Sequence, residues 1–310
     1  MRLATVRTEG GPRLAAVVEG DTTPAPSAET RPHDELVQTL VMLPAALGSL
    51  DDVVRGGAEA LEATRIAAAN GERVPLDPSA LAAPLSRFNR DILCTGWNYW
   101  DHFYESAGLR EGQDPKDKPA HPTFFTKGPD TVVGPTDDIA FDPELSSKWD
   151  YEAELALVIG RDGRSIREED AWEHVFGFLV ANDVSQRDLQ RAHGGQWLKG
   201  KSIDRTMPLG PWVTTLDEVP DPAGLTVECE VDGQLLQSAS TGEMAFPIPT
   251  LIAELSRGMT LRAGDVLLTG TPSGIGNARE PQVFLRDGNI IETRVGGLGS
   301  LRNRVTLTTL

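Results

Sequence analysis

One stretch of the chain, WDYEAELALVIGRD at residues 149–162, is apolar on both sides of a β-strand pattern. Residues two apart on a strand point to the same side of its sheet. One side here carries Tyr151, Ala153, Leu155, Leu157 and Ile159. The other side carries Ala156 and Val158, so neither side has the pattern of a solvent-exposed face. A strand of this kind is buried on both sides, and the chain is expected to build a sheet that is covered twice.

The side with Ala156 and Val158 begins with two acids, Glu152 and Glu154, which lie about 7 Å apart on an extended strand. Two interpretations fit this segment alone. In the first, the strand starts in water and both acids lie on a solvated rim. In the second, the carboxylates are buried and hold a cation, since buried charges are tolerated when they are paired or bind a metal.

Composition restricts the classes of partner. The 310 residues suffice for one large domain, or for one large and one small domain. The formal charge of −17 repels phosphate backbones, so no nucleic-acid partner is expected, and a small anionic substrate would need local cations. The sequence contains neither an apolar run of transmembrane length nor a signal peptide, so a cytoplasmic protein without a membrane partner is expected.

Residues 1–85 differ from the rest of the chain in their pattern of strands and helix, and they are expected to form a small N-terminal α/β domain. The segment at 3–21 has the pattern of a hairpin, and the segment at 50–72 has that of a helix. Residues 74–90, with three prolines, resemble a linker. The residues expected to begin and end the helix are Asp51 or Asp52 as N-cap and Gly71 as stop.

Strand signals dominate residues 86–310, which are expected to form the second and larger domain. Examples are DILCTG, EAELALVIG, VFGFLVAND, LTVECEVDG, DVLLTGT and NIIETRVGG, whereas helical patterns are few and short. Many short strands separated by Gly and Asp turns predict an α+β, mainly β body, a roll or sandwich with small helices. Long helices do not alternate with the strands, which disfavours a doubly wound sheet.

A third acid, Asp183, ends the apolar run VFGFLVAND. It could cap the helix that SQRDLQ predicts, as an isolated Asp often does. With Glu152 and Glu154 it instead makes a set of three carboxylates. Oxygen ligands of this kind suit Mg²⁺ or Mn²⁺, and less often Ca²⁺. Three protein ligands would leave positions open for water and substrate.

The segment GWNYWDHFYESAG contains His102 and Glu105, which lie three residues apart and share one face of a short helix. A carboxylate that touches an imidazole fixes its tautomer and supports a general base. The alternative is an ordinary surface helix, because this spacing is common by chance.

Four side chains that can donate hydrogen bonds occur in the same part of the chain: Lys127, Arg187, Gln190 and Lys201. Each of them alone could also be a solvated side chain. Together they could bind an anionic substrate or a developing oxyanion. The loop GTPSGIG at residues 270–276 is a weak sign of close backbone approach to a ligand. No Walker lysine motif, HExxH or GxSxG occurs in the sequence.

The order of these motifs resembles that of the fumarylacetoacetate hydrolase family. Six segments carry the resemblance, from about Arg90 to the C-terminus: GWNYWDHFYE, FFTKGPDTVVGP, WDYEAELALVIG, NDVSQRDLQ, KSIDRTMPLGPWV and GDVLLTGTPSGIG. The resemblance implies a mixed β-roll catalytic domain, a homodimer and one divalent metal per active site. Residues 1–85 match no catalytic motif, and the polar insert at 109–122 is longer than in compact members.

The resemblance also implies roles for individual residues. Metal ligands would be Glu152, Glu154 and Asp183. His102 and Glu105 would form a catalytic dyad on a mobile lid. The residues that would face the substrate are Lys127, Arg187, Gln190, Lys201 and Thr271.

The leading hypothesis for the reaction is hydrolytic C–C cleavage of a β-diketo acid such as an acylpyruvate. The metal would act as a Lewis acid, His102 would activate water, and Lys127 would help to hold the departing enolate. The same site could decarboxylate a 2-oxo diacid, or act as an isomerase or hydratase in aromatic meta-cleavage catabolism. A rival outside the enzymes is a non-catalytic metal- or ligand-binding protein.

Three aromatic residues surround His102 on the predicted lid: Trp100, Phe103 and Tyr104. One hypothesis is that they line an apolar pocket for a bulky or aromatic acyl group. The alternative is that they only pack the lid against the insert or a partner subunit.

Overall fold

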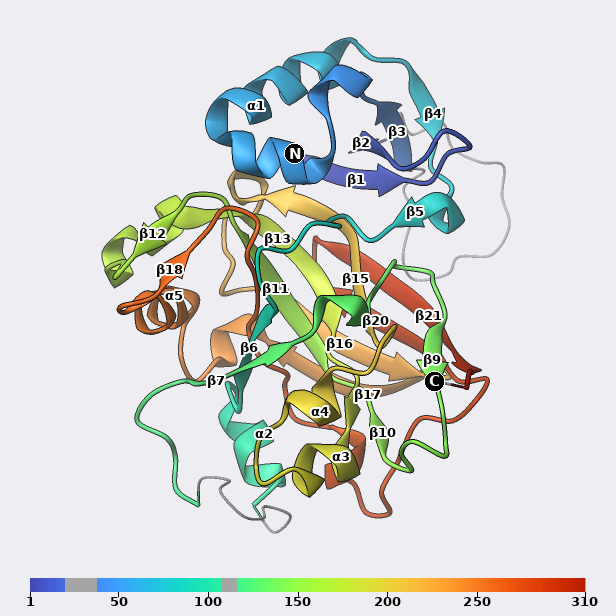
Figure 1. The fold of residues 1–310 in the computed structure, drawn as a ribbon, viewed down its shortest axis with the longest axis vertical. Helices are drawn as coiled ribbons and strands as arrows, with labels where there is room; N and C mark the ends of the chain where they lie inside the picture. The colour runs from blue at the N-terminus through green and yellow to red at the C-terminus, as the bar shows by residue number, and fades with distance from the viewer. Residues whose placement is uncertain (20–37, 108–115, 310) are drawn as a thin grey trace.

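The computed structural model describes residues 1–19, 38–107 and 116–309. Figure 1 shows a body built largely of strands, with the helix α1 (Leu50–Asn70) at one end and three short helices at the other. The expected α+β, mainly β class is therefore confirmed. None of the described helices is both long and apolar enough to cross a membrane.

Twelve of the described strands belong to one large sheet. Its order is β4-β3-β2-β1-β15-β13-β11-β19-β6-β7, with β5 paired to β1 and β8 paired to β15. The strands from the N-terminal part are β1 (Arg2–Val6), β2 (Arg13–Glu19), β3 (Gln38–Met42), β4 (Arg73–Pro75) and β5 (Leu81–Ala82). The others are β6 (Ile92–Gly96), β7 (Thr123–Lys127), β8 (Val132–Val133), β11 (Ala153–Ile159), β13 (Val175–Asn182), β15 (Met207–Thr215) and β19 (Val266–Leu268).

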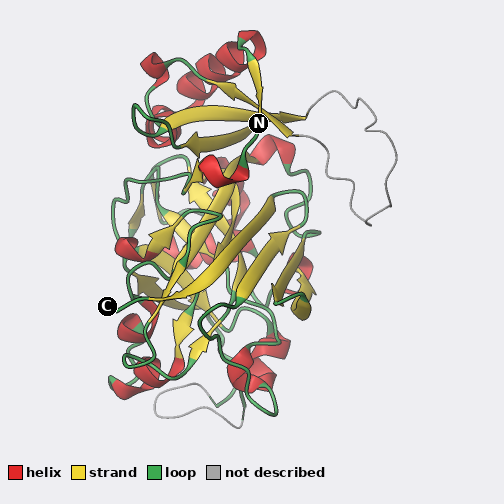
Figure 2. Cartoon of the chain, turned by 90° about the vertical axis from the view of Figure 1, so that its right-hand side faces the viewer, coloured by secondary structure: helices red, strands yellow, loops and turns green. Residues whose placement is uncertain are grey.

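A second sheet of five strands runs in the order β17-β16-β20-β21-β9 and packs against one face of the large sheet (Figure 2). Its strands are β9 (Ile139–Phe141), β16 (Thr226–Val231), β17 (Gln234–Ser240), β20 (Ile290–Val295) and β21 (Gly299–Leu307). Two small strand pairs complete the described sheets: β10 (Trp149–Asp150) with β14 (Ser185–Gln186), and β12 (Gly163–Arg164) with β18 (Thr260–Leu261). The predicted roll or sandwich with mixed sheets is confirmed.

The short helices lie between strands and at their ends. The α-helices after α1 are α2 (Trp100–Glu105), α3 (Arg187–Ala192), α4 (Leu198–Lys201) and α5 (Ile248–Ser256). The 3₁₀ helices are η1 (Ala45–Leu47), η2 (Pro78–Ala80), η3 (Pro129–Thr131), η4 (Glu168–His174), η5 (Leu216–Glu218), η6 (Thr241–Glu243) and η7 (Gly276–Ala278). Figure 1 places α2, α3 and α4 together at the end of the body opposite α1.

Strand β11 lies inside the large sheet, as its two apolar sides predict. Leu155, Leu157 and Ile159 belong to the core between the two sheets. Ala156 and Val158 belong to a second core, which is covered by α1 and the N-terminal strands. Because β11 is covered on both faces, its N-terminal end carries its first polar side chains into the interior of the protein.

The N-terminal segment contains the predicted hairpin and helix, with one correction. The hairpin is β1 and β2, although residues 20 and 21 of its predicted range lie outside the described residues. The helix α1 ends at Gly71 as predicted, but its N-cap is Ser49. Asp52 is the third helical residue and completes a capping box with Ser49, so neither predicted acid is the cap.

The N-terminal segment is hydrogen-bonded to the rest of the protein, because β1 pairs with β15 through Arg2↔Thr214 and Leu3↔Val213. The predicted linker at 74–90 contains β5, which also pairs with β1. The division of the chain at residue 85 stays a prediction. The insert at 109–122 lies outside the described residues up to position 115.

Asp51 connects α1 to the segment that precedes β6. It is 1% exposed and accepts hydrogen bonds from Ser86 N, Ser86 Oγ and Arg87 N, each at 3.1 Å. Asp51→Ala would leave these donors without an acceptor, so we expect it to lower the free energy of unfolding by about 2–3 kcal/mol. Urea denaturation measures this loss. The exposed Glu59 on the same helix is the control, since Glu59→Ala should change stability by less than about 0.5 kcal/mol.

Candidate active site

The antiparallel pairing of β11 and β13 brings the three predicted acids together. Ala153 lies opposite Asn182, and the N–H of Asp183 donates to the carbonyl of Glu152 at 2.9 Å. The carboxylate oxygens of Glu152, Glu154 and Asp183 lie within 4.8 Å of one another. Their exposures are 4%, 1% and 0%, so the interpretation as a solvated rim is wrong.

Asp183 does not cap a helix. Strand β14 intervenes, the N-cap of α3 is Gln186, and no side chain makes a cap hydrogen bond there. The Asp183 side chain is instead held by two lysines. Lys201 Nζ lies 2.7 Å from Asp183 Oδ2, and Lys127 Nζ lies 2.9 Å from Asp183 Oδ1.

Glu152 and Glu154 have different charged neighbours, which shift their pKa values in opposite directions. Glu152 contacts Lys201 at 2.7 Å and Arg187 at 2.6 Å. Burial alone would raise the pKa of the Glu152 carboxyl, but these two cations outweigh burial and lower that pKa. The pKa of Glu154 is raised well above its ordinary value by burial and by the charges of Asp183 and Glu152. Burial would lower the pKa of Lys201, but the neighbouring acids raise it to about 12.

The donor set fits a divalent cation. Three buried carboxylates converge within bonding reach of one ion, and all potential ligand atoms are oxygen, which suits Mg²⁺, Mn²⁺ or Ca²⁺. Glu154 Oε2 accepts the N–H of Gly270 at 2.6 Å. Among the described residues no donor contacts Glu154 Oε1, so a ligand oxygen is available.

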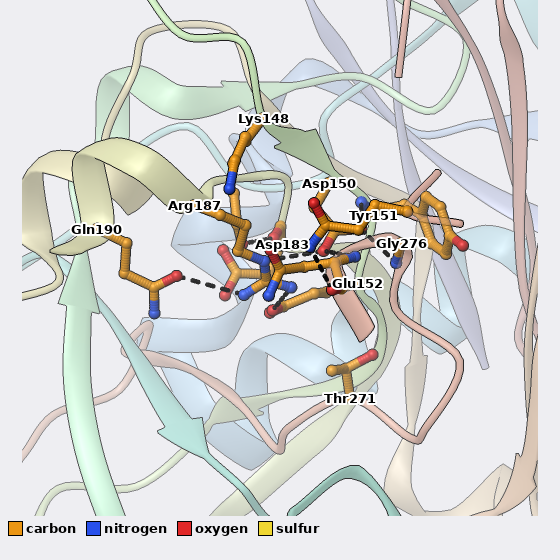
Figure 3. Close-up of polar contacts among 12 residues, drawn as sticks. Lys148, Asp150, Tyr151, Glu152, Asp183, Arg187, Gln190, Thr271 and Gly276 are labelled. Carbon is orange, nitrogen blue, oxygen red and sulfur yellow. Dashed lines mark hydrogen bonds and ion pairs between the residues drawn. The ribbon is translucent and has the colours of Figure 1, made fainter. Parts of the chain in front are cut away.

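Arg187 connects this cluster to the strand that precedes it. Its Nε lies 2.8 Å from Asp150 Oδ2, its Nη2 contacts Glu152, and its Nη1 donates to Gln190 Oε1 at 3.3 Å (Figure 3). Asp150 is fully buried and also accepts the N–H groups of Gly276 and Asn277. The guanidinium is therefore held on three sides by the protein itself.

The predicted dyad is assembled at α2. His102 Nδ1 lies 2.7 Å from Glu105 Oε1, and His102 is 6% exposed, so the interpretation as a plain surface helix is wrong. A carboxylate accepts from a protonated Nδ1, which leaves Nε2 as the nitrogen that can take a proton. Glu105 Oε2 accepts the N–H of Gly274 at 2.7 Å, so the dyad is tied to the glycine-rich loop.

That loop, residues 270–276, approaches carboxylates of the protein. Its N–H groups at Gly270, Gly274 and Gly276 donate to Glu154, Glu105 and Asp150 respectively. Gly274 has a φ of +105°, and a Cβ there would lie 2.1 Å from the carbonyl oxygen of Leu236. Only glycine fits such a position. The loop thus orients acids of the site, and its close approach to a ligand stays a prediction.

A cavity of about 410 Å³ opens beside the dyad and two of the acids. The predicted site residues that line it are His102, Glu152, Glu154, Arg187, Gln190, Lys201 and Thr271. Three predicted site residues lie behind this lining: Glu105, Lys127 and Asp183.

Lys127 is placed differently from its predicted role beside the substrate. Its side chain is 0% exposed, and its Nζ contacts Asp183 Oδ1 and donates to the carbonyl of Val184 at 2.8 Å. Neither partner is part of the cavity lining. This geometry gives Lys127 the role of holding Asp183 and does not support a contact with the departing enolate.

The aromatic residues of the cavity are also different from those expected. Its lining contains Trp97, Phe125 and Trp197, and it contains none of the three lid aromatics Trp100, Phe103 and Tyr104. Trp100 packs against Phe246 and Phe103. Tyr104 is 54% exposed. The packing alternative therefore describes the lid in this structure, and the acyl-pocket hypothesis for these three residues stays a prediction.

Sequence reasoning missed several residues of the site. Asp150 stands next to the quoted acids, but nothing in the sequence connects it to Arg187. Asn98 is fully buried and bonds Phe246 and Thr269. It follows Trp97, which lines the cavity and has a φ of +51°. Helical spacing could have found Arg191, which follows Arg187 by four residues and also lines the cavity.

Comparison with known proteins finds relatives of this chain. The model of the fumarylacetoacetate (FAA) hydrolase C-terminal family matches residues 91–306. The oxaloacetate tautomerase YisK of Bacillus subtilis is 44% identical over 225 residues, which cover 73% of this chain and 72% of that protein.

Two solved structures share the fold. A fumarylacetoacetate hydrolase from Exiguobacterium antarcticum superposes with a TM-score of 0.79 and 35% identity, covering 99% of this chain and 100% of that one. A 5-carboxymethyl-2-hydroxymuconate delta-isomerase from Mycobacterium smegmatis has a TM-score of 0.72 and 28% identity, with coverage of 99% and 100%. With the family model matching more than two thirds of its length, the chain belongs to the fumarylacetoacetate hydrolase family.

Proposed function

We propose that this protein is a divalent-metal-dependent enzyme that interconverts the keto and enol forms of a small 2-oxo diacid of the oxaloacetate type. The observation that carries the proposal is the placement of His102 and the acids Glu152 and Glu154 around one cavity of about 410 Å³. A proton acceptor and a site for a cation then face the same small substrate. The 44% identity to an oxaloacetate tautomerase supports the same chemistry.

Keto–enol exchange requires a proton to leave C3 of the substrate and another to reach the oxygen on C2. His102 Nε2 takes the C3 proton, because Glu105 holds the proton on Nδ1 and stabilises the imidazolium that forms. The same nitrogen then returns a proton, either to the C2 oxygen or to C3. Gly274 keeps Glu105 in place throughout, so the base stays aligned.

Glu152, Glu154 and Asp183 would hold the metal ion. When bound, it supplies a Lewis acid that polarises the 2-oxo group and favours negative charge on its oxygen. Lys127 and Lys201 keep Asp183 and Glu152 oriented, and Arg187 orients Glu152 from the opposite side. The contacts with Lys201 and Arg187 stabilise the ionised form of Glu152 in a buried setting.

Hydrolytic C–C cleavage of a β-diketo acid is the second candidate. The His102–Glu105 dyad favours it, since a base of this geometry can also deprotonate water. The similarity to a fumarylacetoacetate hydrolase of the same fold supports it as well. The two reactions differ in whether water enters the cavity and attacks a second carbonyl.

The deciding experiment assays three reactions with the same protein sample, loaded with Mg²⁺ or Mn²⁺: tautomerisation, C–C hydrolysis and decarboxylation. We expect faster exchange of the C3 hydrogens of oxaloacetate with solvent deuterium, followed by NMR, than with the same concentration of free metal. Formation of two fragments from an acylpyruvate would indicate the hydrolase, and release of CO₂ and pyruvate from oxaloacetate would indicate a decarboxylase. The tautomerase proposal is wrong if exchange does not exceed the free-metal rate or survives complete chelation.

Three expectations from the sequence stay predictions. The metal is Mg²⁺ or Mn²⁺, with Ca²⁺ as the alternative. The enzyme is a homodimer, which sedimentation measures directly. It acts in the cytoplasm on a small anionic acid.

A further inference from the structure

Three cations of the site are neutralised by carboxylates of the protein itself. Lys201 contacts both Glu152 and Asp183, and Lys127 contacts Asp183. Arg187 contacts Asp150 and Glu152. Each of these three cations is therefore already paired with buried carboxylates.

The buried acids also outnumber these cations by four to three. The acids are Asp150, Glu152, Glu154 and Asp183, and the cations are Lys127, Arg187 and Lys201. A divalent ion on three of the acids would leave this set with one surplus positive charge, which matches one carboxylate of a substrate. A second carboxylate would need another cation on the cavity wall, because an unpaired charge in a desolvated pocket is costly.

Arg191 meets this requirement. It lines the cavity, it is half-buried, and no carboxylate or carbonyl contacts its guanidinium among the described residues. It follows Arg187 by four residues on α3, so both side chains lie on one face of that helix, with their Cα atoms about 6 Å apart along its axis.

We propose that Arg191 binds the distal carboxylate of the substrate and thereby selects dicarboxylic over monocarboxylic 2-oxo acids. The inference rests on the proposed function, because it assigns the residue that recognises the second carboxylate of the proposed substrate. A guanidinium presents two parallel N–H donors to a carboxylate, which gives a strong and directional contact. Gly194 and Gly195, both with positive φ, line the cavity close to Arg191 in sequence and leave room for this end of the substrate.

The test compares oxaloacetate with its 4-monomethyl ester, which keeps the C3 hydrogens and lacks the distal charge. For the wild type we expect a higher kcat/KM with oxaloacetate. In Arg191→Gln the ratio of the two kcat/KM values should fall by about 10–100-fold, mainly through the KM for oxaloacetate. Arg191→Lys should restore part of the ratio, since it keeps the charge but loses the paired donors.

Lys199 provides the matched control. It is an exposed cation in the neighbouring helix α4 and does not line the cavity, so Lys199→Gln removes the same charge from the same region. An equal fall of the ratio in Lys199→Gln would show a general field effect and overturn the role of Arg191. An unchanged ratio in Arg191→Gln would overturn it as well.

A binding measurement separates this inference from the proposed reaction. Calorimetry on the metal-loaded protein gives the affinities for succinate and for its monomethyl ester without any turnover. A preference for succinate that is lost in Arg191→Gln supports the inference even if C3 exchange is absent and the tautomerase proposal fails. Equal affinities of the wild type for both ligands would refute it even if oxaloacetate is a good substrate.

Discussion

Glu154→Gln is expected to abolish metal binding and to lower turnover by roughly 10³-fold or more, because the loss of a ligand removes Lewis-acid stabilisation worth several kcal/mol. The same substitution should leave the metal-free protein at least as stable as the wild type. Glutamine keeps an oxygen that can accept the Gly270 N–H. It also removes one of three like charges that lie within 4.8 Å of one another in the interior.

The opposite responses of stability and function make this prediction specific. Thermal unfolding in the presence of a chelator reports the first, and calorimetric titration with Mg²⁺ or Mn²⁺ reports the second. Glu243, an exposed acid of the η6 capping box, is a control, since Glu243→Gln should leave metal affinity and turnover unchanged. Wild-type metal affinity in Glu154→Gln would remove Glu154 from the ligand set.

The central strand could be predicted from a local pattern, whereas the role of its acids was implied by the family resemblance. Alternation along residues 151–159 fixes which side chains share a side, and both sides are apolar. The pattern alone left the two acids at the end of this strand open between a solvated rim and a buried cation site. The resemblance to the family implied that Asp183 joins Glu152 and Glu154, and the pairing of β11 with β13 is what brings the three acids together.

Contacts between distant segments could not be predicted in this way. Asp150 binds Arg187 and the N–H groups of Gly276 and Asn277, which are 37, 126 and 127 residues away in sequence. Lys127 ends β7, and its contact with Asp183 depends on where β7 lies relative to Asp183 in the fold. No pattern within either segment contains that information, because it arises when the sheet order brings the segments together.

The lid aromatics show the same limit. Helical spacing correctly places Trp100 and Tyr104 on one side of α2, but spacing does not say which side faces the cavity. The dyad decides this, because the His102 ring must reach the cavity while Glu105 meets the loop at Gly274. That constraint turns Tyr104 towards solvent, where Lys118 Nζ lies 5.1 Å from its ring centroid.

Turnover of His102→Ala is expected to fall by about 10²–10⁴-fold, the range for loss of a general base, while metal affinity stays at the wild-type level. His102 is not among the acids that converge on the cation site, so its removal leaves those ligands in place. NMR measurement of C3 exchange gives the turnover, and calorimetry gives the metal affinity. Tyr104→Ala on the same helix is the control, since an exposed ring outside the cavity lining should contribute less than about twofold.

Glu105→Gln distinguishes a base from a purely structural histidine. The amide keeps an oxygen for Gly274 but can present its NH₂ group to His102 Nδ1, which would favour the tautomer protonated on Nε2. An imidazole in that tautomer cannot accept the substrate proton, so kcat should fall while KM changes little. Exogenous imidazole should partly restore the turnover of His102→Ala, because removing the buried side chain leaves a space of the same shape beside the cavity. If His102→Ala turns over at the wild-type rate and imidazole has no effect, the proton is moved by another group and the proposed role of the dyad is wrong.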